Sequence, residues 1–148
     1  MYLIPQDFHG KFRVIYGEQC GIEPKEEDGR RVLEIPSNGI LIIKPKFEAG
    51  TVDHEYYLVD KNGYKTKVPI LFDYNDSKKN KLGVFLDGTG SIAGQMPDGS
   101  SSSESTLAIH ISDFYVLNGD TTQKEDYKFE SRFDSLTSAN VDLCRQKK

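Results

Sequence analysis

The sequence predicts a mainly β fold: an antiparallel β-sandwich of about seven strands, prealbumin-like or immunoglobulin-like, with one amphipathic helix at the C-terminal end. Three observations point to this class. Short segments of alternating apolar and polar residues lie between turns, Asn62-Gly63 has the chemistry of a tight hairpin turn, and the apolar period becomes helical after Gly119. A chain of 148 residues suits one such unit, so we expect a single domain over residues 1–148.

The first predicted strand is Lys11–Gly17, where apolar and other side chains alternate. Alternation places Phe12, Val14 and Tyr16 on one face and Arg13 and Ile15 on the other. The next segment, Glu18–Gly29, is polar and broken by glycine and proline, so we expect a loop there.

A second pair of strands is predicted on either side of a turn. Arg30–Ile35 and Ile40–Ile43 flank Pro36–Gly39, in which proline fixes one φ and Asn-Gly tolerates positive φ. Pairing the two strands across this turn would set Ile35 opposite Ile40. We therefore expect a hairpin here, with its second strand covered on both faces.

The clearest hairpin signal joins Glu55–Lys61 to Tyr64–Leu71 through Asn62-Gly63, the preferred pair for a two-residue turn. Such a turn sets Asp60 opposite Lys65, Val59 opposite Thr66, Leu58 opposite Lys67 and Tyr57 opposite Val68. Pro69 has no N–H to donate, so its strand is expected to lie at an edge or to stop pairing there.

The remaining elements are a short strand, a long loop, a long strand and the helix. We expect a strand at Leu82–Leu86, an extended loop at Asp87–Ser105 and the longest strand at Thr106–Leu117. The helix is predicted over residues 124–146, with a break near Ser135. Its expected apolar positions are Phe129, Phe133, Leu136, Val141 and Leu143.

Charge and hydropathy exclude several functions. The chain has 19 Lys and Arg residues against 23 Asp and Glu residues, a net charge of −4, and the two signs are spread evenly along it. Without a basic face, electrostatic capture of nucleic acid is not expected. No apolar run approaches the roughly 20 residues of a transmembrane helix.

The two cysteines bear on the compartment. Cys20 and Cys144 lack the close spacing of a zinc knuckle, and two readings stay open. Either they form a disulfide that ties the C-terminal segment to the first loop, contributing about 4–5 kcal/mol in the chain-entropy model, or they are unrelated thiols. The opening Met1–Pro5 has no signal-peptide regions, so we expect either a cytosolic start or a mature chain trimmed after export.

Catalytic and ligand motifs are weak. A small hydrolase using His110 with a serine of Ser100–Ser103 is the alternative to a non-enzymatic protein. Asp113 would project from the opposite face of a regular strand and could not orient that imidazole. His54, beside two acidic residues, would also face away from them in a strand, and the glycines of 86–94 lack a following helix that could bind phosphate. No cofactor and no metal site is therefore expected.

Several motifs give a family resemblance. Leu3-Ile4-Pro5 with Phe8 and Gly10, followed by Ile35-Pro36 and Gly39, resembles a bacterial family of unknown function. Its small, often exported or lipoprotein-like members open with L-I-P-x-x-(Y/F)-x-G and have an I-P-x-x-G turn. The segment Asp28–Leu41 is more weakly similar to prealbumin-like and carboxypeptidase-regulatory-like sandwiches. The resemblance implies an extracytoplasmic protein with no assigned reaction.

These observations favour a non-enzymatic binding or accessory module of the bacterial cell envelope, located in the periplasm or at the cell surface, with a cytoplasmic protein as the alternative. An unknown protein or glycan is the expected partner. Long glycine-rich loops on rigid scaffolds often carry contacts. The expected contact loop contains Asp87, Gly88, Gly90, Gly94, Asp98, Gly99 and Ser100.

Overall fold

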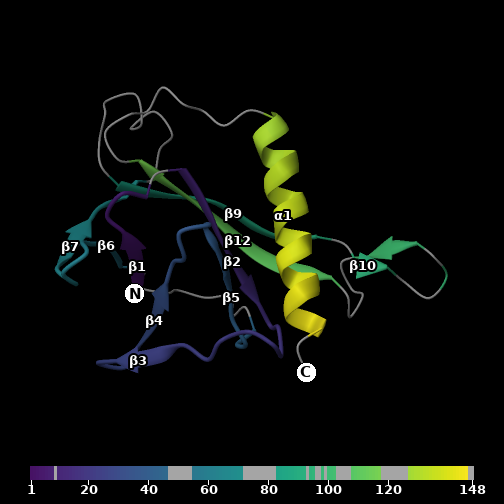
Figure 1. Ribbon diagram of the computed structural model, residues 1–148, viewed down its shortest axis with the longest axis horizontal. Helices are drawn as coiled ribbons and strands as arrows, with labels where there is room; N and C mark the ends of the chain where they lie inside the picture. The colour runs from purple at the N-terminus through teal and green to yellow at the C-terminus, as the bar shows by residue number, and fades with distance from the viewer. Residues whose placement is uncertain are drawn as a thin grey trace.

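A computed structural model (Figure 1) describes residues 1–8, 10–46, 55–71, 83–92, 94–95, 98, 100–102, 108–117 and 127–146. These residues form two five-stranded sheets, a separate two-stranded ribbon and one helix. The class predicted from the sequence, a mainly β sandwich with a C-terminal helix, is confirmed.

The first sheet has the strand order β3-β4-β1-β6-β7. Its strands are β3 (Lys25–Glu27), β4 (Arg30–Glu34), β1 (Tyr2–Pro5), β6 (Tyr56–Val59) and β7 (Lys65–Val68). The central strand β1 runs parallel to both of its neighbours, β4 and β6, whereas the two outer pairs are antiparallel. The carboxyl ends of β4, β1 and β6 therefore meet at one edge of this sheet.

The second sheet has the order β5-β2-β12-β9-β8. Its strands are β5 (Ile40–Ile42), β2 (Gly10–Tyr16), β12 (Ile109–Leu117), β9 (Gly83–Ile92) and β8 (Ile70–Leu71). The long central strands are antiparallel, and the edge strands β5 and β8 are parallel to their neighbours. Because of these pairs and those of β1, the sandwich is mixed rather than purely antiparallel.

Alternation along β2 divides the interior into two apolar clusters. Phe12, Val14 and Tyr16 pack against the first sheet, where Phe12 stacks on Phe114 with ring centroids 4.7 Å apart. Ile15, on the other face, packs with the helix. The cluster between the sheets contains Tyr2, Ile4, Phe12, Val14, Tyr16, Leu33, Ile35, Leu41, Ile43, Tyr56, Leu58, Val68, Val84, Phe114 and Val116. The cluster under the helix contains Ile15, Ile40, Ile109, Phe133 and Val141.

The hairpin predicted from Arg30–Ile35 and Ile40–Ile43 is wrong, because β4 and β5 belong to different sheets. The turn itself has the expected chemistry: Gly39 adopts φ 78° and donates its N–H to the Pro36 carbonyl at 2.9 Å. Beyond the turn, β4 pairs with β1, and β5 runs beside β2. The turn therefore carries the chain from one layer to the other, and parallel partners distant in sequence decide the pairing.

The Asn62-Gly63 hairpin is confirmed as β6 and β7, but its register differs by one residue, since Tyr57 lies opposite Lys67. The Asp60 N–H donates to the Tyr64 carbonyl at 3.1 Å. The Asp60 carboxylate accepts the N–H groups of Asn62 and Tyr64, each at 2.9 Å. These bonds favour a three-residue loop over the expected two-residue turn. Pairing stops after Val68, as Pro69 predicted, and β8 joins the other sheet.

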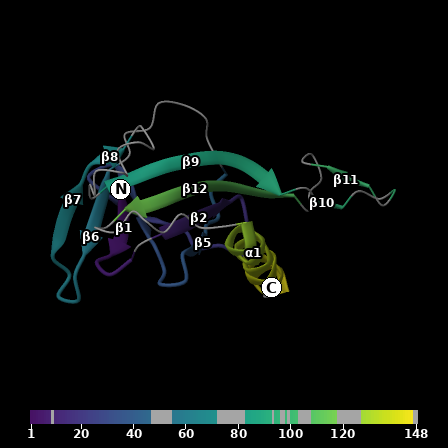
Figure 2. The same cartoon turned by 90° about the horizontal axis from the view of Figure 1, so that it is seen from above.

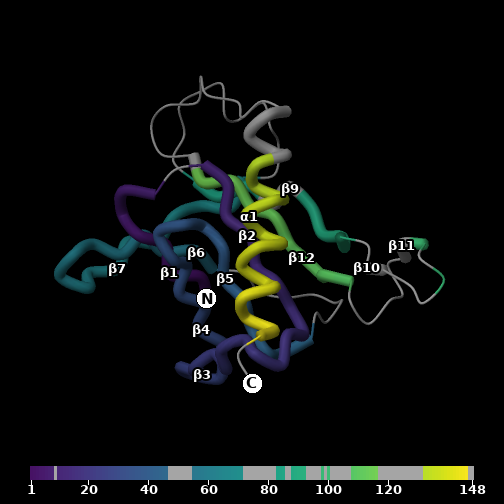
Figure 3. The backbone as a smooth tube through the Cα atoms, turned by 45° about the vertical axis from the view of Figure 1, so that its right-hand side comes forward, coloured from purple at the N-terminus to yellow at the C-terminus, as the bar shows by residue number. Residues whose placement is uncertain are grey.

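The helix α1 (Tyr127–Gln146) is continuous through Ser135, so the predicted break is wrong. Figures 1 and 3 show it lying across β2. Among residues 132–146, the part of the helix whose burial the structure describes, the buried positions are Phe133, Thr137 and Val141, one helical turn apart. The predicted apolar position Phe129 lies outside that part. Leu136 and Leu143, which the period placed on the apolar face, are 44% and 61% exposed.

Several strands were missed or shortened by the sequence analysis, among them β10 (Gly94–Gln95) and β11 (Ser101–Ser102) inside the predicted loop 87–105. Residues 2–5 were treated as a lead-in but form the centre of the first sheet, and β3 lies inside the predicted loop 18–29. The predicted strand Leu82–Leu86 continues as β9 to Ile92. Among the described residues, no helix is long and apolar enough to cross a membrane.

Candidate functional site

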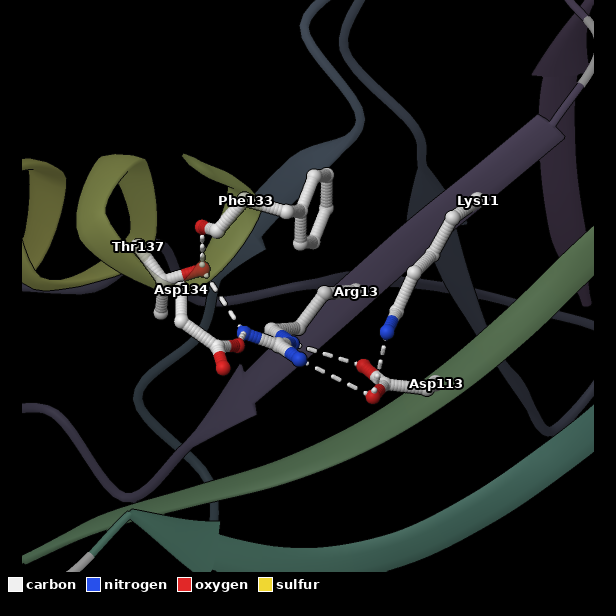
Figure 4. Close-up of polar contacts among 6 residues, drawn as sticks. All are labelled: Lys11, Arg13, Asp113, Phe133, Asp134 and Thr137. Atoms are coloured by element: carbon white, nitrogen blue, oxygen red, sulfur yellow. Dashed lines mark hydrogen bonds and ion pairs between the residues drawn. The ribbon is translucent and has the colours of Figure 1, made fainter. Parts of the chain in front are cut away.

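A group of paired charged side chains lies between α1 and the second sheet (Figure 4). The Arg13 guanidinium donates to both carboxylate oxygens of Asp113, from Nε at 2.7 Å and from Nη2 at 3.0 Å. Its Nη1 donates to Asp134 at 2.8 Å and to the Thr137 hydroxyl at 2.9 Å. Lys11 adds an ion pair with Asp113 at 3.2 Å. One strand residue thus connects β12 to two successive turns of the helix.

The charges in this group balance, two cations against two carboxylates. Burial by itself disfavours the charged guanidinium, but the hydrogen bonds and charges of Asp113 and Asp134 outweigh it and raise the pKa of Arg13. The Phe133 ring lies 4.9 Å from the Arg13 guanidinium and 5.4 Å from the Lys11 ammonium, within cation–π range. The group therefore fastens the helix to the sheet. It presents no activated nucleophile or base.

A second fastening lies at the other end of the helix and joins it to the loop after β2. Cys20 and Cys144 form a disulfide with a Cα–Cα distance of 5.6 Å. Next to it, Arg145 donates from Nε and Nη2 to the two oxygens of Glu18, at 2.7 and 3.0 Å. Glu18 is buried, and the pair raises the pKa of Arg145. We call these four residues, Glu18, Cys20, Cys144 and Arg145, the disulfide clasp.

The predicted contact loop is largely regular structure. Asp87, Gly88 and Gly90 lie in β9, where Gly88 pairs with Asp113 and Gly90 with Ile111. The description of this segment as a loop was therefore wrong. Its residues are poor strand formers, but they pair with β12, which is rich in strand formers, and a distant partner overrides local propensity. The pairing shifts by one residue at Asp87, which is a bulge.

The rest of that segment forms the ribbon of β10 (Gly94–Gln95) and β11 (Ser101–Ser102). Near its turn, Asp98 accepts hydrogen bonds from the N–H and hydroxyl of Ser100, at 2.9 and 2.6 Å, which lower the pKa of Asp98. Gly99 lies outside the described residues. Figures 1 and 2 both show the ribbon extending away from the two sheets.

The alternative hydrolase site is not assembled by the described residues. His110 is exposed, and Asp113 lies on the opposite face of β12 as the strand period predicted. The Ser100 hydroxyl donates to Asp98. Ser103 lies outside the described residues, as do His9 and His54. Within the described part of the chain, no group of three or more His, Cys, Asp or Glu side chains could hold a metal ion.

The sequence analysis missed a groove at the carboxyl ends of the parallel strands β4, β1 and β6. It has a volume of about 830 Å³ and combines an apolar floor with a polar rim. Asp7, Glu34 and Asp60 line it together with one cation, Lys61, so the rim is acidic. It is lined by Leu3, Ile4, Pro5, Gln6, Asp7, Glu34, Ile35, Val59, Asp60, Lys61 and Asn62. Only the parallel pairing of β1 brings these segments together, and no local pattern indicates that pairing.

The first sheet also carries a polar group at the start of β6. The Tyr57 hydroxyl donates to Glu55 at 2.8 Å, and Arg30 pairs with the other oxygen of the same carboxylate at 2.6 Å. Lys67 lies 3.6 Å from it. The hydrogen bond from Tyr57, followed by that from Arg30, lowers the pKa of Glu55 to about 2.

These features define a class: a mixed β-sandwich with a C-terminal helix that a disulfide joins to the loop after β2. The model of a family of unknown function, DUF6843, matches residues 1–127, and the chain belongs to this family. A search of the curated proteins found no match. The fold is similar to the 2.75 Å crystal structure of a "putative lipoprotein from Bacillus anthracis", with a TM-score of 0.69 and 19% sequence identity over 99% of this chain and 96% of that one.

Proposed function

We propose that this protein is a non-enzymatic binding or accessory module of the bacterial cell envelope, located outside the cytoplasm. The observation that carries the proposal is the disulfide between Cys20 and Cys144. Disulfides persist in oxidising compartments and are rare in the bacterial cytosol. The description of the similar solved structure as a lipoprotein supports the same location.

The binding surface we propose is the β10–β11 ribbon with the adjoining end of β9. The ribbon extends beyond the sandwich (Figure 2), and its base continues from β9, which pairs with β12 along most of its length. Asp98 and Ser100, near the turn of the ribbon, are exposed, and projecting segments on a rigid scaffold often carry binding contacts. We expect this partner to be an envelope protein or glycan.

Thiol trapping in the native host tests the compartment. Cells are acid-quenched, and the denatured protein is treated with a maleimide that adds a measurable mass to each free thiol. We expect no addition unless the sample is first reduced. Two additions without reduction would show that Cys20 and Cys144 are thiols in the cell, which contradicts the proposed location.

Site-specific photo-crosslinking in the same cells tests the surface. A photoreactive residue replaces Asp98 or Ser100 in the ribbon, and matched variants carry it at Asn62 in the groove and at the exposed Glu23. We expect partner adducts from the ribbon positions and none from Glu23. Adducts from Asn62 alone would move the binding surface to the groove and reject the ribbon.

A further inference from the structure

We propose that the disulfide clasp is a redox latch: reduction of Cys20–Cys144 releases the C-terminal half of α1 from the second sheet, while the N-terminal half stays docked. This device goes beyond the proposed binding function, and it is testable on the purified protein whatever its partner. It follows from the unequal way in which the two halves of the helix are held.

The N-terminal half of α1 has contacts that do not depend on sulfur. Asp134 and Thr137 both accept hydrogen bonds from Arg13, at 2.8 and 2.9 Å. The Phe133 side chain is buried against Ile15 and Ile40 in the cluster under the helix. Reduction leaves these contacts intact, so this half keeps its position.

Besides the disulfide, two side chains carry the described contacts of the C-terminal half, Val141 and Arg145. Val141 is its one buried apolar side chain among the described residues, and Leu143 is 61% exposed. Cys144 makes the covalent link, and Arg145 pairs with Glu18. Arg145 is 27% exposed, and its long side chain reaches the buried Glu18 through two hydrogen bonds. Without the disulfide, this half keeps Val141, this ion pair and a hydrogen bond of 3.5 Å from Arg145 to the Ala108 carbonyl.

The loop that carries Cys20 is fixed independently of the helix. The Gly21 N–H donates to the Glu18 carbonyl at 2.8 Å, and Ile22 exchanges backbone hydrogen bonds with the segment 42–44 at the end of β5, at 3.0 and 2.9 Å. A Cβ at Gly21 would lie 2.5 Å from the Ile43 carbonyl carbon, so the loop packs directly on that segment. The helix, rather than the loop, is therefore the part that moves.

Cys20 and Cys144 are both half-buried rather than buried, and the latch requires a reductant to reach their disulfide. The co-reactant is a dithiol of the C-x-x-C oxidoreductase class. One of its thiolates attacks a disulfide sulfur and forms a mixed disulfide, and its second thiol then resolves that bond. The Cys20–Cys144 bond breaks, a disulfide forms in the dithiol, and its two hydrogens end on the Cys20 and Cys144 thiols. Val141 then leaves the cluster under the helix and uncovers part of Ile15 and Ile109.

Hydrogen exchange at short labelling times, followed by mass spectrometry, tests the latch. The same folded sample is compared before and after reduction with dithiothreitol, and the Cys20→Ser/Cys144→Ser variant provides an independent reduced state. We expect amides of residues 138–146 to exchange at least about 10-fold faster in both reduced forms, while peptides of residues 131–137, β2 and β12 stay protected.

Two results would overturn the proposal. Unchanged exchange in residues 138–146 would show that the helix stays docked without the disulfide. Equal acceleration along the whole helix or in the strands would show that the disulfide only stabilises the fold. Leu143→Ala, which keeps the disulfide and removes an exposed side chain, is the matched control and is expected to match the oxidised protein.

Discussion

Arg13 and Asp113 face each other across β2 and β12, and two hydrogen bonds of 2.7 and 3.0 Å join their side chains. Arg13 is 2% exposed, and the Asp113 side chain is 14% exposed. A buried guanidinium is stable only when it is paired, because the loss of hydration must be offset. Asp113 also neutralises Lys11. The carboxylate of this one residue therefore contacts both buried cations, and Asp134 supplies the second negative charge.

Replacing Asp113 with Asn is expected to lower the free energy of unfolding by about 3 kcal/mol, because two buried cations then face a neutral side chain. Urea denaturation at neutral pH measures the change. Glu26→Gln, which neutralises an exposed carboxylate on β3, is the control and should alter stability by less than about 0.5 kcal/mol. Equal effects of the two substitutions would show that burial of the pair contributes nothing.

Glu55 gives a prediction about pH. Its pKa falls from 4.5 to about 2 through the hydrogen bonds from Tyr57 and Arg30. A carboxylate with a depressed folded pKa stabilises the protein above its unfolded pKa and loses this contribution as the pH falls through the folded value. We expect the difference in the free energy of unfolding between wild type and Glu55→Gln, the stability gap, to have its full size above about pH 5. This gap should then shrink as the pH falls towards 2.

The measurement is the urea midpoint of both proteins from pH 7 to pH 2. Tyr57→Phe removes the hydroxyl donor, so the pKa of Glu55 then rises. When both proteins also carry Tyr57→Phe, we expect the gap to close at a higher pH. A gap that stays constant through acid would rule out the Glu55 carboxylate as its source.

Local chemistry in the sequence was sufficient for turns and for strand faces. The alternation of residues 11–17 correctly separated Phe12, which enters the core between the sheets, from Arg13, which faces the helix. Pro36–Gly39 and Asn62-Gly63 are turns, because their φ preferences are intrinsic to glycine. Local patterns therefore located these turns and strand faces, although the loop at Asn62-Gly63 is one residue longer than expected.

Pairing between distant segments was not predictable in this way. Strand β1 has partners about 30 and 55 residues later in the chain, and nothing in residues 2–5 identifies them. Arg13 reaches Asp134 across a sequence separation of 121. The two cysteines, 124 residues apart, left the disulfide open. The groove and both helix fastenings depend on such contacts, so the structure was needed to find them.

Thr137 gives a prediction about the helix fastening. Its hydroxyl donates to the Phe133 carbonyl at 2.9 Å and accepts from Arg13 at 2.9 Å, and the side chain is fully buried. Thr137→Val keeps the volume but removes the acceptor, so we expect a loss of about 1–3 kcal/mol in the free energy of unfolding. Ser138→Ala, on the next and more exposed position, should change it little. A neutral Thr137→Val variant would show that Arg13 does not need this hydroxyl.

Substitution of Gly39 or Gly63 by alanine distinguishes two costs of a side chain at positive φ, that of the backbone conformation and that of displacing a neighbouring segment. Both residues adopt it, at 78° and 84°. A Cβ at Gly39 would lie 2.9 Å from the Lys11 carbonyl oxygen and 3.3 Å from the Phe8 ring, whereas nothing lies within 4 Å of one at Gly63. Gly63→Ala is therefore expected to carry only the conformational cost, about 1–2 kcal/mol.

Gly39→Ala should carry that cost and, in addition, the displacement of β2 at Lys11. Because the Gly39 carbonyl accepts the Arg13 N–H at 2.7 Å, this displacement also disturbs the start of the β2–β5 pairing. We expect a loss at least about 1 kcal/mol larger than for Gly63→Ala, measured as the difference between two urea unfolding curves. Equal losses would mean that β2 can be displaced at Lys11 without a cost in the free energy of unfolding. The turn between the two sheets would then be stabilised by its own backbone conformation alone.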